Sequence, residues 1–177
     1  MIDMASLSPA EIRLKQSAAF LAHFNHASRP NHDCWFEMSM YFDAFLFCFV
    51  SIEEMVDSQK KKVLQKAPSF RFFKVLRNIS THHSILTGAS PGSKFPRPLT
   101  RYIPETIGAP ETEQVEFRIK PDVLRSIFDQ VAIEVQRERA NIEAAKGFLA
   151  SLEANGGHIH IRHVMQKAID EASSNVA

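Results

Sequence analysis

The residues best suited to chemistry in this sequence lie in one short segment, Arg77-Asn78-Ile79-Ser80-Thr81-His82. A guanidinium presents a planar fork of donors that matches phosphate oxygens and can neutralise the charge that develops on a phosphorane. An imidazole titrates near neutrality and can accept or return a proton. Because the 2′-hydroxyl of RNA supplies an internal nucleophile, such a pair could cleave a phosphodiester without a metal. Asn78 could orient His82 or hold a phosphate oxygen.

The same segment lies in the most basic part of the chain. Between residues 58 and 104 there are ten lysines or arginines and no acidic residue, although the whole chain has a formal net charge of only +1. The other residues comprise 11 cations and 20 acids, a net charge of −9. The whole chain therefore shows no general preference for nucleic acid, whereas this stretch does. We predict phosphate contacts at Lys60, Lys61, Lys62, Lys74 and Thr81.

The arginine, the polar residue directly after it and the histidine after four intervening positions resemble the motif of the HEPN superfamily. The resemblance implies an all-α bundle and a dimer in which the motifs of both subunits line one cleft. It also implies metal-independent endoribonuclease activity, frequently in toxin–antitoxin or anti-phage defence systems. Under it, Arg77 and His82 would be catalytic and Asn78 would be their polar helper. A nucleotidyltransferase-type antitoxin would be a partner, although the tyrosine that such partners modify is replaced here by Ser84.

Helical periodicity divides the segment around the motif into two faces. The apolar face holds Phe72, Leu76, Ile79, His83 and Leu86, whereas the polar arc holds Lys74, Arg77, Asn78, Thr81 and His82. We therefore expect His83 to be a hydrogen-bonded core residue and His82 to be the candidate for chemistry. Two alternatives remain open for the polar arc. It could be a solvated helix face, or Arg77 could pair in the core with Glu37 or Asp43, either of which could otherwise orient His82.

The distribution of apolar residues predicts a single all-α domain over residues 1–177, built as a bundle of about five helices. The helices are expected to start at Ser8 and to cover about 32–58, 68–87, 121–155 and 158–173. A Pro-rich loop insertion at 88–120 would contain a short β-ribbon, in which residues 99–103 pair with 115–119. The helix at 32–58 is apolar nearly all round, which favours homodimerisation through it.

Composition and cysteine spacing favour a soluble cytoplasmic protein. Cys34 and Cys48 would lie about 21 Å apart on one helix, too far for a disulfide, and a reduced interior is typical of the cytosol. The longest apolar run is interrupted by Glu37 and Asp43 and is shorter than the roughly 20 residues that a membrane span needs. We therefore predict no membrane association.

A second group of titratable residues consists of His158, His160 and His163. Two histidines three positions apart on a helix could share a metal, but no carboxylate or cysteine accompanies them in the sequence. The paired Glu-x-x-His pattern of carboxylate di-metal bundles is also absent. We predict neither a metal nor a cofactor.

Two functions of different classes are therefore open. The first is a dimeric HEPN-type endoribonuclease with RNA as substrate, acting as a toxin or defence effector. The second is a non-catalytic helical dimer that binds RNA or a protein partner through the basic face.

Overall fold

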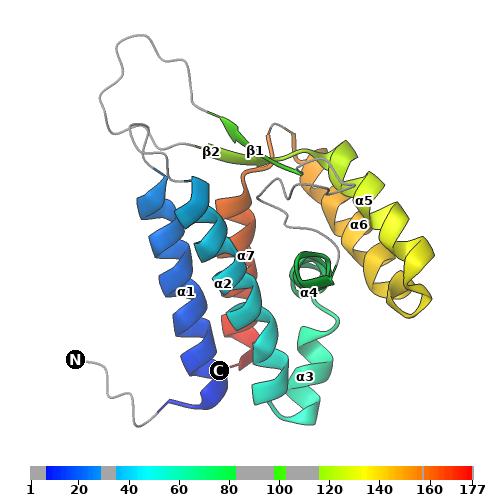
Figure 1. Ribbon diagram of the computed structural model, residues 1–177. Helices are drawn as coiled ribbons and strands as arrows, with labels where there is room; N and C mark the ends of the chain where they lie inside the picture. The colour runs from blue at the N-terminus through cyan, green and yellow to red at the C-terminus, as the bar shows by residue number, and fades with distance from the viewer. Residues whose placement is uncertain (1–6, 29–34, 83–97, 103–115, 157, 177) are drawn as a thin grey trace.

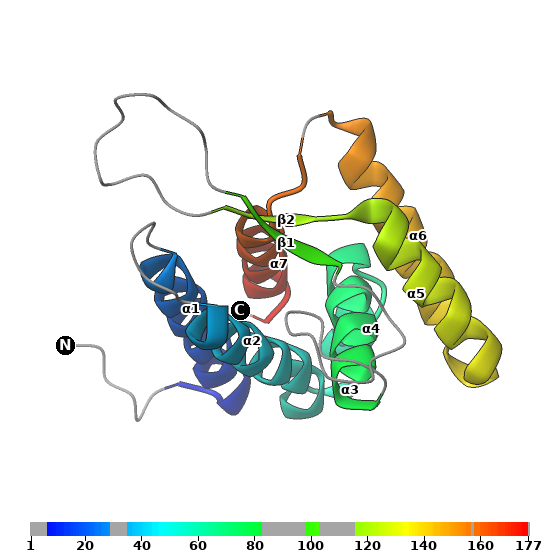
Figure 2. The same cartoon turned by 45° about the horizontal axis from the view of Figure 1, so that its top comes forward.

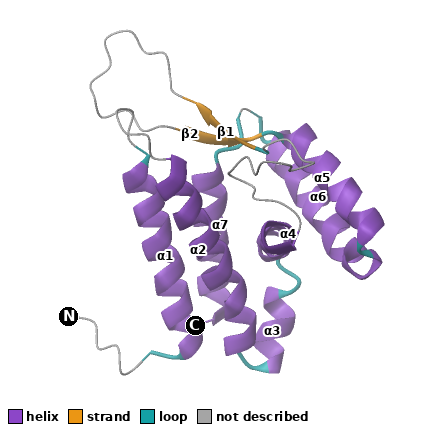
Figure 3. Ribbon diagram, viewed as in Figure 1, coloured by secondary structure: helices purple, strands orange, loops and turns teal. Residues whose placement is uncertain are grey.

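Figure 1 shows the computed structural model, which describes residues 7–28, 35–82, 98–102, 116–156 and 158–176. The predicted helical bundle is confirmed, and Figure 3 shows how far helices dominate the described residues. Within them lie seven α-helices and two strands: α1 (Pro9–Ala27), α2 (Trp35–Met55), α3 (Ser58–Leu64), α4 (Pro68–His82), β1 (Leu99–Tyr102), β2 (Glu116–Ile119), α5 (Pro121–Glu134), α6 (Arg139–Ala154) and α7 (Ile161–Val176). Cys34, His83, Ser84, Leu86 and most of the loop predicted at 88–120 lie outside the described residues.

The first helix begins where its capping residues predict. The Ser8 hydroxyl accepts a hydrogen bond from the Glu11 backbone N–H (3.3 Å), and the Ser8 backbone N–H donates to the Glu11 carboxylate (2.7 Å). This reciprocal capping box satisfies two N–H groups that would otherwise lack a partner at the helix start. α1 then runs antiparallel to α2, and α7 packs along α1, as Figures 1 and 2 show.

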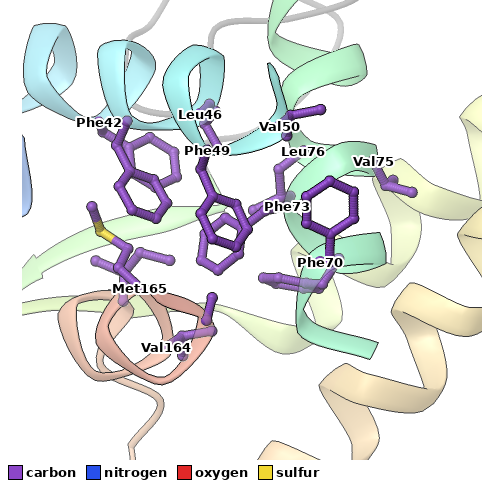
Figure 4. Close-up of a cluster of buried hydrophobic side chains, with 14 of the residues drawn as sticks. Phe42, Leu46, Phe49, Val50, Phe70, Phe73, Val75, Leu76, Val164 and Met165 are labelled. Atoms are coloured by element: carbon purple, nitrogen blue, oxygen red, sulfur yellow. The ribbon is translucent and has the colours of Figure 1, made fainter. Parts of the chain in front are cut away.

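The centre of the molecule is a cluster of phenylalanines contributed by α2 and α4 (Figure 4). The rings of Phe45 and Phe49 are stacked with centroids 5.3 Å apart, and the edge of Phe73 meets Phe45 at 5.2 Å. Each fully buried phenylalanine contributes roughly 1.5–3 kcal/mol through the hydrophobic effect. Phe45 and Phe49 of α2 therefore help to hold α4 in place.

α4 is buried on two sides, because it lies between α2 and the hairpin of α5 and α6 (Figure 2). Its residue Phe72 contacts Phe148 of α6 at 5.3 Å and Phe128 of α5 at 6.4 Å. Phe70 and Phe73, at positions on or next to the predicted polar arc, are fully buried against α2. The division of α4 into one apolar and one polar face is therefore wrong for its first half.

The single long helix predicted at 121–155 is wrong. The backbone of Val135 leaves the helical region (φ −126°, ψ 80°), and a 3₁₀ turn at Gln136–Glu138 separates α5 from α6. Apolar spacing is correct on both helices, because Val131 and Ile142 are buried. The spacing continues across the polar turn, so periodicity alone could not distinguish one long helix from two helices folded back on each other.

The predicted count of about five helices also missed α3, a separate short helix between α2 and α4. Its N-cap is Asp57, whose carboxylate accepts hydrogen bonds from the backbone N–H groups of Gln59 (2.8 Å) and Lys60 (2.9 Å). Such a cap stabilises a helix start by about 1 kcal/mol.

β1 and β2 form an antiparallel ribbon over one end of the bundle, with Leu99 opposite Ile119 and Tyr102 opposite Glu116. The segment before α7 joins its edge, since the Ile119 N–H donates to the Ile159 carbonyl (2.9 Å). Phe117 and Ile119 turn their side chains into the core. Among the described helices, none has the length and apolar character needed to cross a lipid bilayer.

Candidate functional site

The predicted motif occupies the second half of α4. Arg77 and Asn78 are half-buried, Thr81 is exposed, and its hydroxyl donates to the Arg77 carbonyl (2.9 Å). His82 is the last residue of α4, and its side chain lies outside the described part of the molecule. The helix therefore presents Arg77 part-way into the protein and carries His82 to its carboxyl end.

Arg77 has a different environment from the other cations of α4. The Arg71 guanidinium donates to the Gln65 carbonyl (2.5 Å), and the Lys74 ammonium contacts both carboxylate oxygens of Glu53 at 2.6 and 2.9 Å. The Nε of Arg77 is buried and has no hydrogen-bond partner, and within the described residues the guanidinium forms no ion pair. The alternative that Arg77 pairs with Glu37 or Asp43 is therefore not what the structure shows.

Asp43 lies beside the same part of α4. The carboxylate of this half-buried residue accepts a hydrogen bond from the Ser80 hydroxyl (3.0 Å), and Ser80 is one turn of helix beyond Arg77. Burial raises the pKa of Asp43, and the hydrogen bond from Ser80 opposes that rise only in part. This end of the contact between α2 and α4 thus holds an acid whose burial is only partly compensated.

The predicted phosphate-binding residues are not gathered in one place. Lys60, Lys61 and Lys62 belong to α3, which lies at the amino end of α4. A helix of 15 residues separates α3 from His82, a length of about 22 Å. Lys60 also donates to the Val176 carbonyl at the end of α7 (2.6 Å), and Lys74 is held by Glu53. Of the predicted set, Thr81 alone lies in the turn that ends at His82.

The geometry of α4 bears on how Arg77 and His82 could act together. Five residues of helix separate them by about 7.5 Å along the axis and about 140° around it. The two backbone positions therefore differ both in height along α4 and in angle around it.

α2 offers an apolar surface on which a second copy could pack. Phe36, Met40 and Phe47 are 78%, 46% and 54% exposed. These three positions fall within about 40° of one another around the helix, so they form one stripe. An exposed stripe of large apolar side chains is typical of an interaction surface.

A second concave site, which sequence reasoning identified only in part, lies where α6 passes into α7. Asn155, His158, His160, His163 and Lys167 line a pocket of about 220 Å³. The rings of His160 and His163 are 5.3 Å apart. Within the described residues, no group of three potential metal ligands is arranged to hold a metal ion. The three histidines were visible in the sequence, and Lys167 follows His163 at helical spacing of four.

Comparison with protein-family models, with curated proteins and with solved structures finds no match for this chain. The resemblance to the HEPN superfamily therefore rests on the motif and remains a prediction.

Proposed function

We propose that this chain is a metal-independent endoribonuclease of the HEPN type that works as a homodimer in a toxin or defence role. The observation that carries the proposal is the Nε of Arg77, a buried donor with no hydrogen-bond partner among the described residues, whereas Arg71 and Lys74 on the same helix are held by other groups of the protein. A buried donor without an acceptor is costly. An RNA phosphate would supply the missing acceptor and, as a bidentate partner, would fit its donor fork.

The reaction follows from the residue types. His82, acting as general base, takes the proton of the 2′-hydroxyl, and that oxygen forms a bond to phosphorus. Arg77 stabilises the negative charge on the phosphorane oxygens. The bond from phosphorus to the 5′-oxygen then breaks, and the departing oxygen takes up a proton from the imidazolium of His82. The products are a 2′,3′-cyclic phosphate and a free 5′-hydroxyl.

A homodimer would bring the required groups together. An active groove would combine groups from two copies of α4. The exposed stripe Phe36–Met40–Phe47 on α2 offers apolar area for a contact between copies. It lies on the side of α2 opposite to Phe45, which packs on α4. Thr81 and Asn78 lie on the same half of α4 and would contact the substrate phosphate.

The test is cleavage of total RNA by the purified protein in EDTA. Arg77→Ala, Arg77→Lys and His82→Ala are each expected to lower the rate at least about 100-fold, since removing a single donor to a developing oxyanion has an effect of that size. Arg77→Lys keeps the positive charge but removes the planar fork of donors. It therefore distinguishes a general electrostatic attraction for the phosphate from a bidentate contact with two phosphate oxygens. Arg137→Ala, at an exposed turn, and His26→Ala, on α1, serve as matched controls.

Circular dichroism and the solution mass of each variant keep folding and dimerisation separate from catalysis. A substrate with a 2′-deoxy nucleotide at the cleaved position is expected to resist cleavage. Undiminished cleavage by Arg77→Ala or His82→Ala would remove these residues from the mechanism. Binding of RNA that weakens steeply with salt, with no cleavage by the unaltered protein, would instead favour the non-catalytic binder.

A further inference from the structure

The pocket between α6 and α7 is lined by an unusual concentration of groups that carry or can acquire positive charge. His158, His160 and His163 share it with Asn155 and Lys167. The Lys167 ammonium lies 5.6 Å from the centroid of the neighbouring Phe148 ring and would swing from it to reach a ligand. His163 and Lys167 are both exposed on successive turns of α7, and His160 immediately precedes that helix. The basic residues of the lining therefore come from one short segment.

The position of α7 adds to this positive potential. The helix has 16 residues and begins at Ile161, beside the pocket. The backbone N–H groups of His163 and Val164 fold back on the His160 carbonyl (3.1 and 3.3 Å), which fixes His160 at the helix start. The amino end of a helix carries a partial positive charge and favours anions.

An acid contacts His160 from β2 and is itself paired with an arginine. The carboxylate of Glu116 on β2 accepts two hydrogen bonds from Arg118, at 2.9 and 3.1 Å. The same oxygen lies 3.4 Å from Nδ1 of His160. Glu116 is thus already neutralised by Arg118, and it can still favour a protonated ring at His160.

We propose that this pocket binds a phosphate group, held by the imidazolium rings of His160 and His163 and by the Lys167 ammonium. Three charged donors suit the three terminal oxygens of a phosphate monoester. The volume of about 220 Å³ is below the roughly 300–1,000 Å³ of pockets for drug-sized ligands. The pocket therefore fits a phosphate with at most a sugar-sized appendage. This proposal does not depend on the proposed nuclease, because the pocket is built from other elements than α4.

Binding should be coupled to proton uptake. Burial lowers the pKa of His160, as do the charges of His163, Arg118 and Arg162, and Glu116 opposes them. Without an anion the neutral form of the His160 ring is therefore favoured, and a bound anion would favour the protonated form. The charged and titratable groups around this ring are Glu116 and Arg118 from β2, His158 before it, and Arg162, His163 and Lys167 from α7.

The experiment is a titration of the full chain with inorganic phosphate, followed by calorimetry and by the NMR signals of the histidine rings. Saturable binding is expected, with about tenfold higher affinity at pH 6 than at pH 8 when the affinities are expressed for the phosphate dianion, because at least one proton is taken up by the protein with the ligand. The signal of His160 should titrate at higher pH when phosphate is present.

Two variants test the donors directly. Lys167→Met and His163→Asn are each expected to weaken phosphate binding about tenfold, the loss of one charge-assisted hydrogen bond. Both residues are exposed, so the fold should persist, and Lys15→Met and His26→Asn on α1 serve as matched controls. Affinity that is unchanged in both pocket variants, or equal at the two pH values, would overturn the proposal.

Separate arms identify the source of the phosphate. Ribose 5-phosphate and a short RNA with a 5′-phosphate are compared with the same RNA lacking it. Preference for the sugar phosphate indicates a free metabolite, and preference for the phosphorylated RNA indicates a strand end. RNA that binds equally with and without the terminal phosphate reports contacts elsewhere, such as the proposed groove on α4. Ribose 5-phosphate and inorganic phosphate that bind Lys167→Met as tightly as the unaltered protein contradict the proposal.

Discussion

Two acids of α2 contact α4 at opposite ends of the same helix pair, and their environments differ. Glu53 receives the Lys74 ammonium (2.6 and 2.9 Å) and the Gln65 amide (3.0 Å), whereas Asp43 receives only the Ser80 hydroxyl (3.0 Å) among the described groups. Burial alone would raise the pKa of Glu53, but the contacts with Lys74 and Gln65 lower it by more; at Asp43 burial prevails and raises the pKa.

This difference separates an end of the interface whose acid is well compensated from an end whose acid is not. Near Glu53 the Lys74 ammonium and the Gln65 amide are both engaged with the carboxylate. At the other end Asp43 has a hydroxyl as its partner, and the Arg77 Nε, on the same half of α4 as Ser80, has no hydrogen-bond partner within the described residues. Uncompensated titratable groups cluster at functional sites, because their charges are kept for a substrate.

The largest effect is expected from removing the cation at the well-compensated end. Lys74→Met should lower the free energy of unfolding by about 3 kcal/mol, since it leaves the Glu53 carboxylate buried without its charge partner. Urea denaturation at pH 7 measures this change. Lys146→Met is the matched control, because Lys146 pairs with the exposed acids Asp129 and Glu143 and should cost at most about 1 kcal/mol.

The double variant Glu53→Gln/Lys74→Met sharpens that comparison. With the acid neutralised, most of the lost stability should return, because the cost comes from an unpaired charge and not from lost packing. A double variant as unstable as Lys74→Met would show that the aliphatic part of Lys74 matters more than its charge.

A smaller loss is expected at the other end. Ser80→Ala removes the hydroxyl that donates to Asp43 and should destabilise the protein by about 1.5 kcal/mol, the usual contribution of a hydrogen bond to a charged group. It should also raise the pKa of Asp43 further, which the ¹³C NMR signal of its carboxyl group would report. A lower pKa in the variant would contradict the assignment of Ser80 as the opposing influence.

Features that depend on neighbouring residues could be predicted from the sequence, whereas features that depend on how the helices cross could not. The capping box at Ser8 and the position of Arg77 on a helix follow from residue types and spacing within a few positions. The pair formed by Glu53 and Lys74 joins residues 21 positions apart, so it depends on how α2 and α4 cross. The contact of Glu116 with His160 likewise depends on the ribbon that brings β2 to α7.

The break between α5 and α6 escaped prediction for another reason. Helix periodicity gives the buried face of each segment but not the direction in which the chain continues after it. Val135 leaves the helical conformation next to a polar turn, a signal that resembles an exposed part of a long helix. The surroundings of the candidate site could not be predicted from the sequence for a related reason. Lys74 lies in the basic stretch of the sequence, but in the folded protein its ammonium contacts the Glu53 carboxylate.

A modest gain is expected when the poorly compensated acid is neutralised. Asp43→Asn should raise the free energy of unfolding at pH 7 by up to about 1 kcal/mol, because the amide keeps an acceptor for Ser80 and avoids the cost of a half-buried charge. Urea denaturation would detect it. Destabilisation of the same size would mean that an ionised Asp43 is required by a neighbouring group.

The dependence of stability on pH distinguishes the two acids by sign. The lowered pKa of Glu53 means that its contribution is fully present above its ordinary value of 4.5 and is lost as the pH falls through the lowered folded-state value. The raised pKa of Asp43 has the opposite consequence: its contribution to stability is present below its ordinary value of 3.8 and is lost as the pH rises through the raised folded-state value.

Asp43→Asn should therefore gain stability relative to the unaltered protein as the pH rises, whereas Glu53→Gln should lose stability relative to it. Urea midpoints measured from pH 3 to pH 7 test both signs, and equal slopes for the two variants would contradict the contrast between the two ends of the α2–α4 interface.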